Sequence, residues 1–353
     1  MASTAHGWGT DSADQPLRPM IFDRRAPRPD DVVIRISHAG ICHSDLHICR
    51  NDWHKSRYPV VPGHEIVGTV TEVGNEVTRH SVGDTVAVGC MVDSCMACPQ
   101  CLEGWEVFCE KGMVGTYNGI DMNDGSLTKG GYADHIVVRD HFVCKVPDGM
   151  DIARVAPLLC AGITTYSPLR QYGVREGSKV AVVGLGGLGH MGVKLAAAMG
   201  AHVTMITTTA SKGADARTLG ADDVIVSTEA GQMKAAAKRF DFILNTIPVA
   251  HDITPYLRLL GRSGRMVLVG AIDQMPPFHS YNLISMNRAV GGSAIGGIPE
   301  TQEMLDFCAA KGIYPECEMI PMNQVNEAYE RLLKNDVRYR FVIDMALAAP
   351  SVE

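Results

Sequence analysis

Residues 179–200 read KVAVVGLGGLGHMGVKLAAAMG. The apolar run KVAVV, the glycine-rich turn and the alanine-rich stretch after it are typical of a strand, a tight turn and a helix. In this setting Gly184 makes the turn, Gly186 lets the backbone approach a pyrophosphate, and Gly189 permits close helix packing. The helix N-terminus also offers amide donors to the anion. The stretch predicts a dinucleotide-binding unit, and a turn that binds no ligand is the alternative.

The chain that follows alternates short apolar runs with alanine-rich helical stretches. This alternation is typical of βαβ units that build a parallel sheet. The further expected strands are HVTMI at 202–206, DVIV at 223–226, DFILN at 241–245 and RMVLVG at 265–270. We therefore predict a nucleotide-binding α/β domain of the Rossmann type over residues 156–295.

The chain before this domain has a different texture, with short runs rich in Val, Gly and Pro. Such runs favour strands and turns. They are VVIRISHAG at 32–40, HEIVGTVTEVG at 64–74, DTVAVG at 84–89 and GGYADHIVV at 130–138. We predict a β-rich lobe over residues 1–155.

The chain after residue 295 changes texture again. TQEMLDFCAAKG at 301–312 and NEAYERLLKN at 326–335 predict amphipathic helices, and YRFVIDM at 339–345 predicts a closing strand. We expect residues 296–353 to return to the first lobe, so that the α/β domain is inserted in the β-rich one.

The composition restricts the class of protein. The 353 residues are 46% hydrophobic and 20% charged, which excludes a disordered chain. The net charge of -7 lacks the basic footprint of a nucleic-acid binder, so we expect small-molecule partners. No apolar run approaches the roughly 18 residues of a transmembrane helix, and the N-terminal stretch has no basic segment followed by an apolar one. We expect a cytoplasmic protein without a membrane partner.

The chain has eleven cysteines, an odd number that suits metal-bound and free thiols in a reducing compartment. Cys95, Cys98, Cys101 and Cys109 lie in the run CMACPQCLEGWEVFC. Two-residue gaps let neighbouring thiolates converge on a tetrahedral centre, and zinc takes four thiolates at roughly 2.3 Å in a closed structural site. We predict a structural zinc site; buried or redox-active thiols and other metals are the alternatives.

Further metal-ligand types are scattered along the chain. Cys42 ends a strand in GICHSDLH, His64 follows a Pro-Gly turn in PGHE, and Cys160 lies in APLLCAG. Singly, each is explained as well by a core thiol or a solvated histidine. Together they form the Cys₂His set with an open fourth position that catalytic zinc has in alcohol dehydrogenase. Glu65 either orients or transiently binds this metal, or joins a surface salt bridge.

The end of the strand after the glycine turn distinguishes between the two nicotinamide cofactors. An acidic residue roughly 20 positions on would bind the ribose 2′-hydroxyl and repel a 2′-phosphate. No carboxylate occurs between the glycine turn and Asp215. Thr207, Thr208 and Thr209 offer hydroxyl groups and Lys212 a cation, which suit a phosphate dianion. We predict NADP(H), and a polar loop with a surface lysine is the alternative.

With these motifs in place, the chain resembles the zinc-dependent medium-chain alcohol dehydrogenases. Within them it is similar to the cinnamyl alcohol dehydrogenase-like aldehyde reductases, including broad-range microbial members. The resemblance spans nearly the whole chain and is carried by GICHSDLH, YPVVPGHEIVG, the four-cysteine run, PLLCAGITTYSPL, GLGGLGHMGVKLA, ETQEMLDFC and NDVRYRFVID. It implies a Rossmann domain inserted in a GroES-like catalytic domain, with two zinc ions per subunit.

The resemblance also implies cofactor contacts that spacing does not reveal. Ser44 and Thr164 would lie near the nicotinamide, Thr246 and Gly270 along the cleft, and residues 293–295 beside the carboxamide. His43 is either a phosphate contact or a surface histidine. The full expected cofactor set is His43, Ser44, Thr164, Gly184, Leu185, Gly186, Gly187, Leu188, Gly189, Thr207, Thr208, Thr209, Lys212, Thr246, Gly270, Ser293, Ala294 and Ile295.

The chain departs from the plant members of this group in the expected substrate pocket. Gly115 stands where those enzymes have a tryptophan before the TYN tripeptide, and Ala294 stands where a phenylalanine follows the Gly-Ser pair. We expect Trp53 to cover the pocket and Cys90 and Met91 to line it. The missing aromatic walls favour a broad range of aldehydes, including aromatic and cinnamyl-type ones, over a dedicated monolignol specificity.

The expected reaction transfers hydride between NADP(H) and a primary alcohol/aldehyde pair, with zinc as the Lewis acid. A proton would pass through Ser44, the ribose hydroxyl and His47; an exposed helix residue is the alternative role for His47. The rival enzyme is an NAD-linked catabolic alcohol or polyol dehydrogenase, and a non-catalytic cofactor-binding or redox-sensing protein is a third alternative. The resemblance further implies a homodimer paired through strands near RAVGGSAIG at 288–296.

Overall fold

The computed structural model describes residues 2–270 and 274–347, which divide into two compact units. Unit 1 contains the chain up to Cys160 and again from Gly297, and unit 2 is Ala161–Gly296. The predicted insertion of one domain in another is confirmed. The first boundary lies at 160/161 instead of 155/156, because the buried turn η4 (Ala156–Leu159) packs against the sheet of unit 1. The second lies at 296/297 instead of 295/296.

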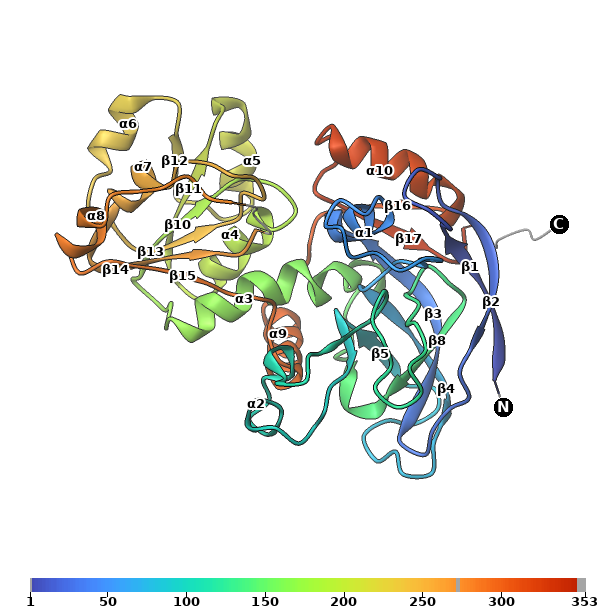
Figure 1. Cartoon of the computed structure of the whole chain (residues 1–353). Helices are drawn as coiled ribbons and strands as arrows, with labels where there is room; N and C mark the ends of the chain where they lie inside the picture. Colours follow the sequence, from blue (N-terminus) through green and yellow to red (C-terminus); the bar gives the residue numbers. More distant parts are fainter. Residues whose placement is uncertain (1, 271–273, 348–353) are drawn as a thin grey trace. The chain divides into compact units, whose positions relative to one another are not determined.

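Unit 2 is built around one parallel sheet (Figure 1). Within the described residues the sheet has six strands, in the order β12-β11-β10-β13-β14-β15, and each neighbouring pair is parallel. The strands are β10 (Lys179–Val183), β11 (His202–Thr207), β12 (Asp223–Val226), β13 (Phe240–Asn245), β14 (Leu260–Leu268) and β15 (Ala289–Gly292). The helices are α3 (Ala161–Gln171), α4 (Gly189–Ala198), α5 (Gly213–Thr218), α6 (Ala230–Ala235), α7 (Thr254–Leu257) and α8 (Tyr281–Ile284).

The sequence of β10 explains its central place in this sheet. Its residues from Val180 to Val183 are apolar and buried, as in strands that helices cover on both faces. β11 and β13 lie on either side of β10, so successive strands are added in opposite directions from it. Such a switch point is where parallel sheets bind nucleotides, at the carboxyl ends of the strands. The five expected strands are present, and the predicted Rossmann type is confirmed.

Unit 1 contains a mostly antiparallel sheet. Within the described residues seven strands take part, along the path β16-β17-β3-β4-β5-β9 with β8 also paired to β3. The strands of the unit are β1 (Ser3–Gly9), β2 (Arg18–Arg24), β3 (Asp31–Ile41), β4 (Ile66–Val73), β5 (Thr85–Val88), β6 (Met91–Asp93), β7 (Val114–Gly115), β8 (His135–Arg139), β9 (Val143–Lys145), β16 (Cys317–Ile320) and β17 (Arg340–Asp344). Its helices are α1 (His43–Cys49), α2 (Pro99–Leu102), α9 (Ile298–Lys311) and α10 (Val325–Leu333).

The C-terminal segment completes the sheet of unit 1, as predicted. β17 pairs antiparallel with β3, with Phe341 opposite Ile41. In Figure 1 the red helix α10 lies beside the blue helix α1, and one buried cluster joins Leu46 of α1 to Tyr329 of α10. β3 leads directly into α1. The C-terminal elements β17 and α10 therefore hold the start of α1 in place, although they are far from it in the sequence.

The β1–β2 hairpin was not predicted, because STAHGWG contains glycine and alanine, which are depleted in strands. Among the described residues, no helix combines the length and the apolar character needed to cross a membrane.

Replacing Phe341 with alanine tests the return of the C-terminal segment. Phe341 has 0% exposure, so the cavity and the lost burial should lower the free energy of unfolding by about 3–5 kcal/mol. Urea denaturation followed by tryptophan fluorescence measures this loss, because Trp8, Trp53 and Trp105 all belong to unit 1. Leu347→Ala, at a position that is 57% exposed, is the control and should change it by about 0.5 kcal/mol or less. Equal losses in the two variants would contradict the prediction.

Candidate functional site

Four predicted metal-ligand residues of unit 1 meet at one point. Cys42 follows β3, His64 and Glu65 precede β4, and Cys160 follows η4. Their ligand atoms all lie within 4.8 Å of one another. All four residues are buried, so residues from three separate parts of the sequence converge in a water-poor environment.

The sulfur spacing of this cluster suits a metal ion. The Sγ atoms of Cys42 and Cys160 are 3.9 Å apart, whereas a disulfide would place them at about 2.05 Å. Four ligands at the usual zinc–sulfur distance form a tetrahedron with an edge of about 3.8 Å. Two thiols and one imidazole leave the fourth corner for Glu65 or for a small oxygen ligand.

The protonation of the two thiols also favours a cation between them. Hydrogen bonding with Cys160 lowers the pKa of Cys42 well below its ordinary value, and the same contact raises the pKa of Cys160. The pair therefore retains a proton that a metal ion would have to displace. Metal binding to such a set releases protons and becomes tighter as the pH rises.

Asp45, which the sequence analysis did not single out, orients His64. Its Oδ1 atom lies 3.0 Å from His64 Nδ1 and accepts a hydrogen bond from the Gly63 N–H at 3.0 Å. Its Oδ2 atom accepts from the Cys42 N–H at 2.9 Å and from the Tyr132 hydroxyl at 3.3 Å. The carboxylate requires a donor, so Nδ1 carries the proton and Nε2 is left to bind a metal. The sequence signal is the short spacing from Cys42, with Asp45 as the N3 residue of a capping box.

Glu65 is paired inside the protein and does not join a surface salt bridge. Its Oε1 atom accepts a hydrogen bond from the guanidinium of Arg340, which is also buried. A Cβ atom on Gly40 would lie 1.9 Å from Glu65 Oε2, so only glycine leaves room for this carboxylate. Burial raises the pKa of Glu65 to about 7. Arg340 was missed because its partner lies far away in the sequence, where no local pattern reveals it.

The residues predicted for proton transfer lie on helix α1. The Ser44 hydroxyl is 3.7 Å from the Cys42 sulfur. His47 lies one helical turn further on, and its Nδ1 atom is 2.7 Å from Asp52 Oδ2. The ring of Trp53 is 5.2 Å from the His47 ring. His43 is exposed. The chain therefore holds a hydroxyl beside the cluster of predicted metal ligands and a partly exposed imidazole nearer the surface.

The other predicted pocket residues differ in exposure. Cys90 donates a hydrogen bond to the carbonyl oxygen of Leu159, with sulfur and oxygen 3.7 Å apart, so it lies next to Cys160. Met91 pairs with Gly115 between β6 and β7. Met91 is only 2% exposed, which leaves little of its side chain for a substrate. Ala294 is exposed in unit 2.

The second group of cysteines forms a separate cluster in the loop around α2. The ligand atoms of Cys95, Cys98, Cys101 and Cys109 lie within 4.8 Å of one another. Two sulfur–sulfur distances, Cys98–Cys101 and Cys95–Cys101, are 3.5 and 3.9 Å, again close to the tetrahedral edge. With four sulfurs and no adjacent open position, this donor set suits a structural zinc ion.

The surroundings of this loop shift the pKa values of its cysteines in both directions. Backbone N–H groups lower the pKa of Cys95 to about 6. Burial raises the pKa of Cys101 to about 12. A cation among the sulfurs is therefore needed to bring all four to the thiolate form.

The glycine turn in unit 2 has the geometry expected for binding a pyrophosphate. Gly184 has φ +93°, which side chains rarely tolerate. A Cβ atom on Gly189 would lie 1.8 Å from the Gly184 oxygen, whereas nothing lies within 4 Å of the corresponding position on Gly186. Thr246 Oγ1 donates to the carbonyl oxygens of Val183 and Gly184, at 2.8 and 3.0 Å. The turn is therefore packed against the protein at Gly189 and has free space beside Gly186. Leu185, Gly187 and Leu188 complete it before α4.

Other predicted cofactor residues also lie at the carboxyl ends of strands. Thr207 ends β11 and is buried, whereas Thr208, Thr209 and Lys212 after it are exposed. Three of these four predicted phosphate contacts therefore offer their side chains to solvent. The predicted nicotinamide contact Thr164 lies instead on a helix, in the buried part of α3.

The chain after β14 and β15 supplies the remaining predicted contacts. Gly270 follows β14, and a Cβ atom on it would lie 2.4 Å from the Ile247 oxygen. Ser293 follows β15 and donates its N–H to the Leu268 oxygen at 3.1 Å. Ile295 has φ +39°, a conformation that costs a β-branched residue about 1–3 kcal/mol. Strain of this kind persists only where the surrounding structure holds it in place.

Two family models match this chain. Residues 28–148 match the family model described as the alcohol dehydrogenase GroES-like domain, and residues 187–310 match that described as a zinc-binding dehydrogenase. The chain is 54% identical over 340 residues to the aldehyde reductase YahK of Escherichia coli, covering 95% of this chain and 97% of that protein.

Solved structures agree with the sequence matches. A cinnamyl alcohol dehydrogenase from Sorghum bicolor has a TM-score of 0.96 and 46% identity, over 99% of this chain and 100% of that one. The cinnamyl alcohol dehydrogenase from Helicobacter pylori complexed with NADP(H) has a TM-score of 0.92 and 42% identity, over 98% and 99% of the two chains. The resemblance drawn from the motifs is confirmed.

Replacing Asp45 with asparagine tests the role of this carboxylate. Asparagine keeps the size of the side chain, but its NH₂ group replaces one carboxylate oxygen. Two donors already point at each of those oxygens, so His64 should lose its orientation. We expect zinc affinity at the Cys42–His64–Cys160 cluster to fall by about 10–100-fold. Dialysis against graded chelator with zinc analysis measures this, while the four-cysteine cluster should keep its metal. Asp148→Asn, at an exposed position, is the matched control; equal zinc retention in both variants would disprove the role.

Proposed function

The chain belongs to the zinc-binding alcohol dehydrogenase family, and we propose that it interconverts aldehydes and primary alcohols with NADP(H), mainly as an aldehyde reductase. Each subunit would hold one catalytic and one structural zinc ion. The observation that carries the proposal is the convergence of Cys42, His64 and Cys160, with Asp45 behind the imidazole. This donor set leaves a coordination position open, as catalysis requires.

The preference for NADP(H) is supported by the loop after β11. Thr208, Thr209 and Lys212 are exposed there, and no carboxylate is present to repel a 2′-phosphate. The similar Helicobacter pylori structure contains NADP(H). These observations favour the proposal over an NAD-linked alcohol or polyol dehydrogenase, which would use an acidic residue at this position.

Two bound groups would supply the central chemistry: zinc would polarise the aldehyde oxygen, and the reduced nicotinamide would donate hydride. The residues of this chain would position these two groups. Asp45 would hold His64 in one orientation, and Arg340 would neutralise Glu65 beside the metal. The turn 184–189 would bind the pyrophosphate, and Thr164 and residues 293–295 would hold the nicotinamide end of the cofactor.

The proton needed by the product alcohol would come through helix α1. Ser44 accepts and donates through one hydroxyl group, and it lies against Cys42. We assign the proton reservoir to His47, whose imidazole is partly exposed and contacts Asp52. The cofactor ribose hydroxyl would link the two. An imidazole can accept a proton on one ring nitrogen and donate one from the other.

A broad substrate range is the third part of the proposal. Gly115 and Ala294 replace larger aromatic residues of plant relatives, so the pocket would accept aliphatic, aromatic and cinnamyl-type aldehydes. Trp53 and Cys90 would border it. The residues of the pocket, and not the shared fold, would set this range, because one fold hosts many specificities.

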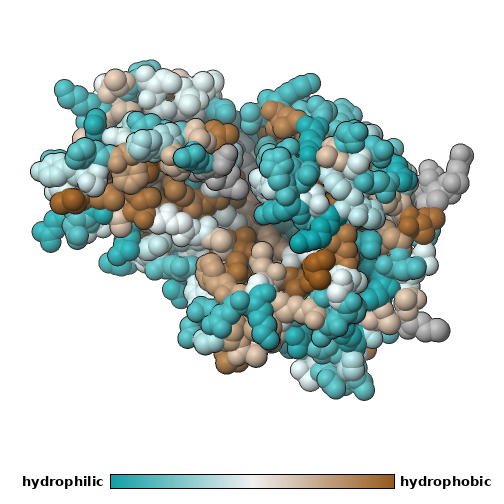
Figure 2. Space-filling view, in the orientation of Figure 1, coloured by the Kyte–Doolittle hydropathy of each residue, from teal (hydrophilic) through white to brown (hydrophobic). Residues whose placement is uncertain are grey.

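We also propose that the protein is a cytoplasmic homodimer. Among the described residues, β15 is one of the two edge strands of the sheet in unit 2, and an uncovered edge readily pairs with another copy. Tyr281 and Ile284 of the adjoining α8 are 64% and 71% exposed, and Figure 2 shows apolar atoms gathered on this side of unit 2. All eleven cysteines are free, which suits a reducing compartment.

Initial rates test the proposed function. Aliphatic, aromatic and cinnamyl aldehydes are offered with NADPH or NADH, before and after zinc removal by a chelator. We expect zinc-dependent reduction of many aldehydes, with kcat/KM for NADPH at least about tenfold above that for NADH, since a 2′-phosphate contact is charge-assisted. A preference for NADH would restore the NAD-linked alternative. Absence of turnover in zinc-replete protein would favour a non-catalytic role.

Two cysteine variants separate the proposed zinc roles. Cys160→Ala should lower kcat by at least about a hundredfold, because Lewis-acid stabilisation is worth several kcal/mol, while the unfolding midpoint changes little. Cys98→Ser should lower the unfolding midpoint by about 5 °C or more and reduce activity only as folded protein is lost. Differential scanning calorimetry, zinc analysis and steady-state kinetics measure the difference. Equal effects of both substitutions on midpoint and zinc content would contradict the assignment.

A further inference from the structure

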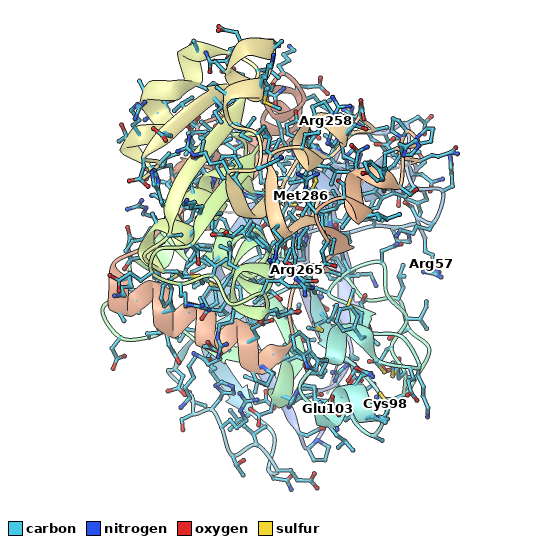
Figure 3. The ribbon with its side chains drawn as sticks, turned by 90° about the vertical axis from the view of Figure 1, so that its left-hand side faces the viewer. Arg57, Cys98, Glu103, Arg258, Arg265 and Met286 are labelled. Carbon is cyan, nitrogen blue, oxygen red and sulfur yellow. The ribbon has the colours of Figure 1, made fainter. Side chains whose placement is uncertain are left out.

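Glu106 is a buried carboxylate that neither the metal clusters nor the proposed cofactor contacts use. It begins the turn η1 (Glu106–Phe108) in the four-cysteine loop and has 0% exposure. Its Oε1 atom lies 2.5 Å from His141 Nε2. Its Oε2 atom accepts a hydrogen bond from the Ile298 N–H at 2.9 Å. Figure 3 labels Cys98 and Glu103 on the same loop.

Ile298 lies where the chain re-enters unit 1 from unit 2. Unit 1 resumes at Gly297, and Ile298 is the next residue and the first of α9. The first N–H groups of a helix have no partner within the helix, and a negative charge there is favoured by the helix dipole. The Glu106 carboxylate therefore fixes the unit 1 end of this chain crossing.

Close backbone packing holds the same crossing against the zinc loop. A Cβ atom on Gly297 would lie 1.6 Å from the Gly104 oxygen. A Cβ atom on Gly104 would in turn lie 2.9 Å from Pro299 Cγ. The crossing thus lies directly on the loop that carries the four cysteines, with no space for a side chain between them.

The other end of the crossing is fixed in unit 2. The Ser293 N–H donates to the Leu268 oxygen of β14 at 3.1 Å. Ala294, Ile295 and Gly296 are the residues between this anchor and unit 1. Ile295 has φ +39°, a conformation that costs a β-branched residue about 1–3 kcal/mol and persists only where neighbouring contacts hold it.

We propose that Glu106 is a positioning residue for the cofactor. By holding Ile298, it would keep residues 293–295 in the strained conformation that presents their backbone to the nicotinamide carboxamide. The inference rests on the proposed function, which assigns those residues to the carboxamide. It gives the four-cysteine loop a second role besides stability: this loop holds one end of a cofactor-binding segment.

A purely structural role for Glu106 makes a different prediction. In that case its loss would destabilise the four-cysteine loop, lower the unfolding midpoint and release one zinc ion, but would leave cofactor affinity unchanged in the protein that remains folded. α9 is also held at its second turn, where Gln302 and Lys145 exchange hydrogen bonds of 2.8 and 3.1 Å. Removing Glu106 is therefore expected to release the crossing without detaching the whole helix.

The test measures NADPH binding by fluorescence titration without substrate, on zinc-replete full-length protein. Glu106→Ala should raise the Kd by about tenfold, the factor that corresponds to one lost hydrogen bond to a charged group. Glu106→Gln keeps the acceptor for Ile298 and should restore most of the affinity. Glu106→Asp, too short to reach both partners, should be intermediate. Glu103→Ala, exposed on the same loop, is the matched control and should bind as wild type.

The outcomes separate the inference from the proposed function. Wild-type affinity in folded, zinc-replete Glu106→Ala and Glu106→Asp would overturn the positioning role. Both variants could instead lose the fold or zinc while the protein that remains intact binds NADPH normally. That result would assign Glu106 to stability and would also overturn the positioning role. Absence of NADPH binding by the wild-type protein would instead refute the proposed function.

Discussion

The proposed catalytic site depends on one buried carboxylate. Asp45 accepts hydrogen bonds from the backbone of Cys42 and Gly63 and contacts the ring of His64, so two proposed metal ligands from different loops share one acceptor. A buried charge without donors is strongly unfavourable, and the donors therefore cannot move away from it. The loops around the metal position are held in place by this requirement, and a metal ion would find its ligands already oriented.

The rest of unit 1 supports this arrangement from distant parts of the chain. β17 pairs with β3 and brings Arg340 to Glu65, and α10 packs against α1. The C-terminal segment thus supplies the cation that pairs with Glu65 in the proposed metal site, as well as part of the core.

Local patterns predicted much of this architecture. The strand–turn–helix at residues 179–200 and the apolar runs after it identified the parallel sheet, because periodicity and glycine placement are local properties. The spacing of the four cysteines predicted a cluster that the structure brings together. Asp45, Arg340 and Glu106 were not identified, because their roles depend on partners that only folding brings near. The boundary at 160/161 was missed because η4 is apolar and short, and its packing partner is not evident from its own sequence.

Anomalous diffraction at the zinc absorption edge, from crystals grown with NADPH, would show directly whether both proposed sites bind zinc. Two zinc peaks per chain are expected. One should lie within bonding distance of Cys42 Sγ, His64 Nε2 and Cys160 Sγ, and the other among the sulfurs of the four-cysteine cluster. No peak at the first position, or a zinc ion there bound without His64, would contradict the account.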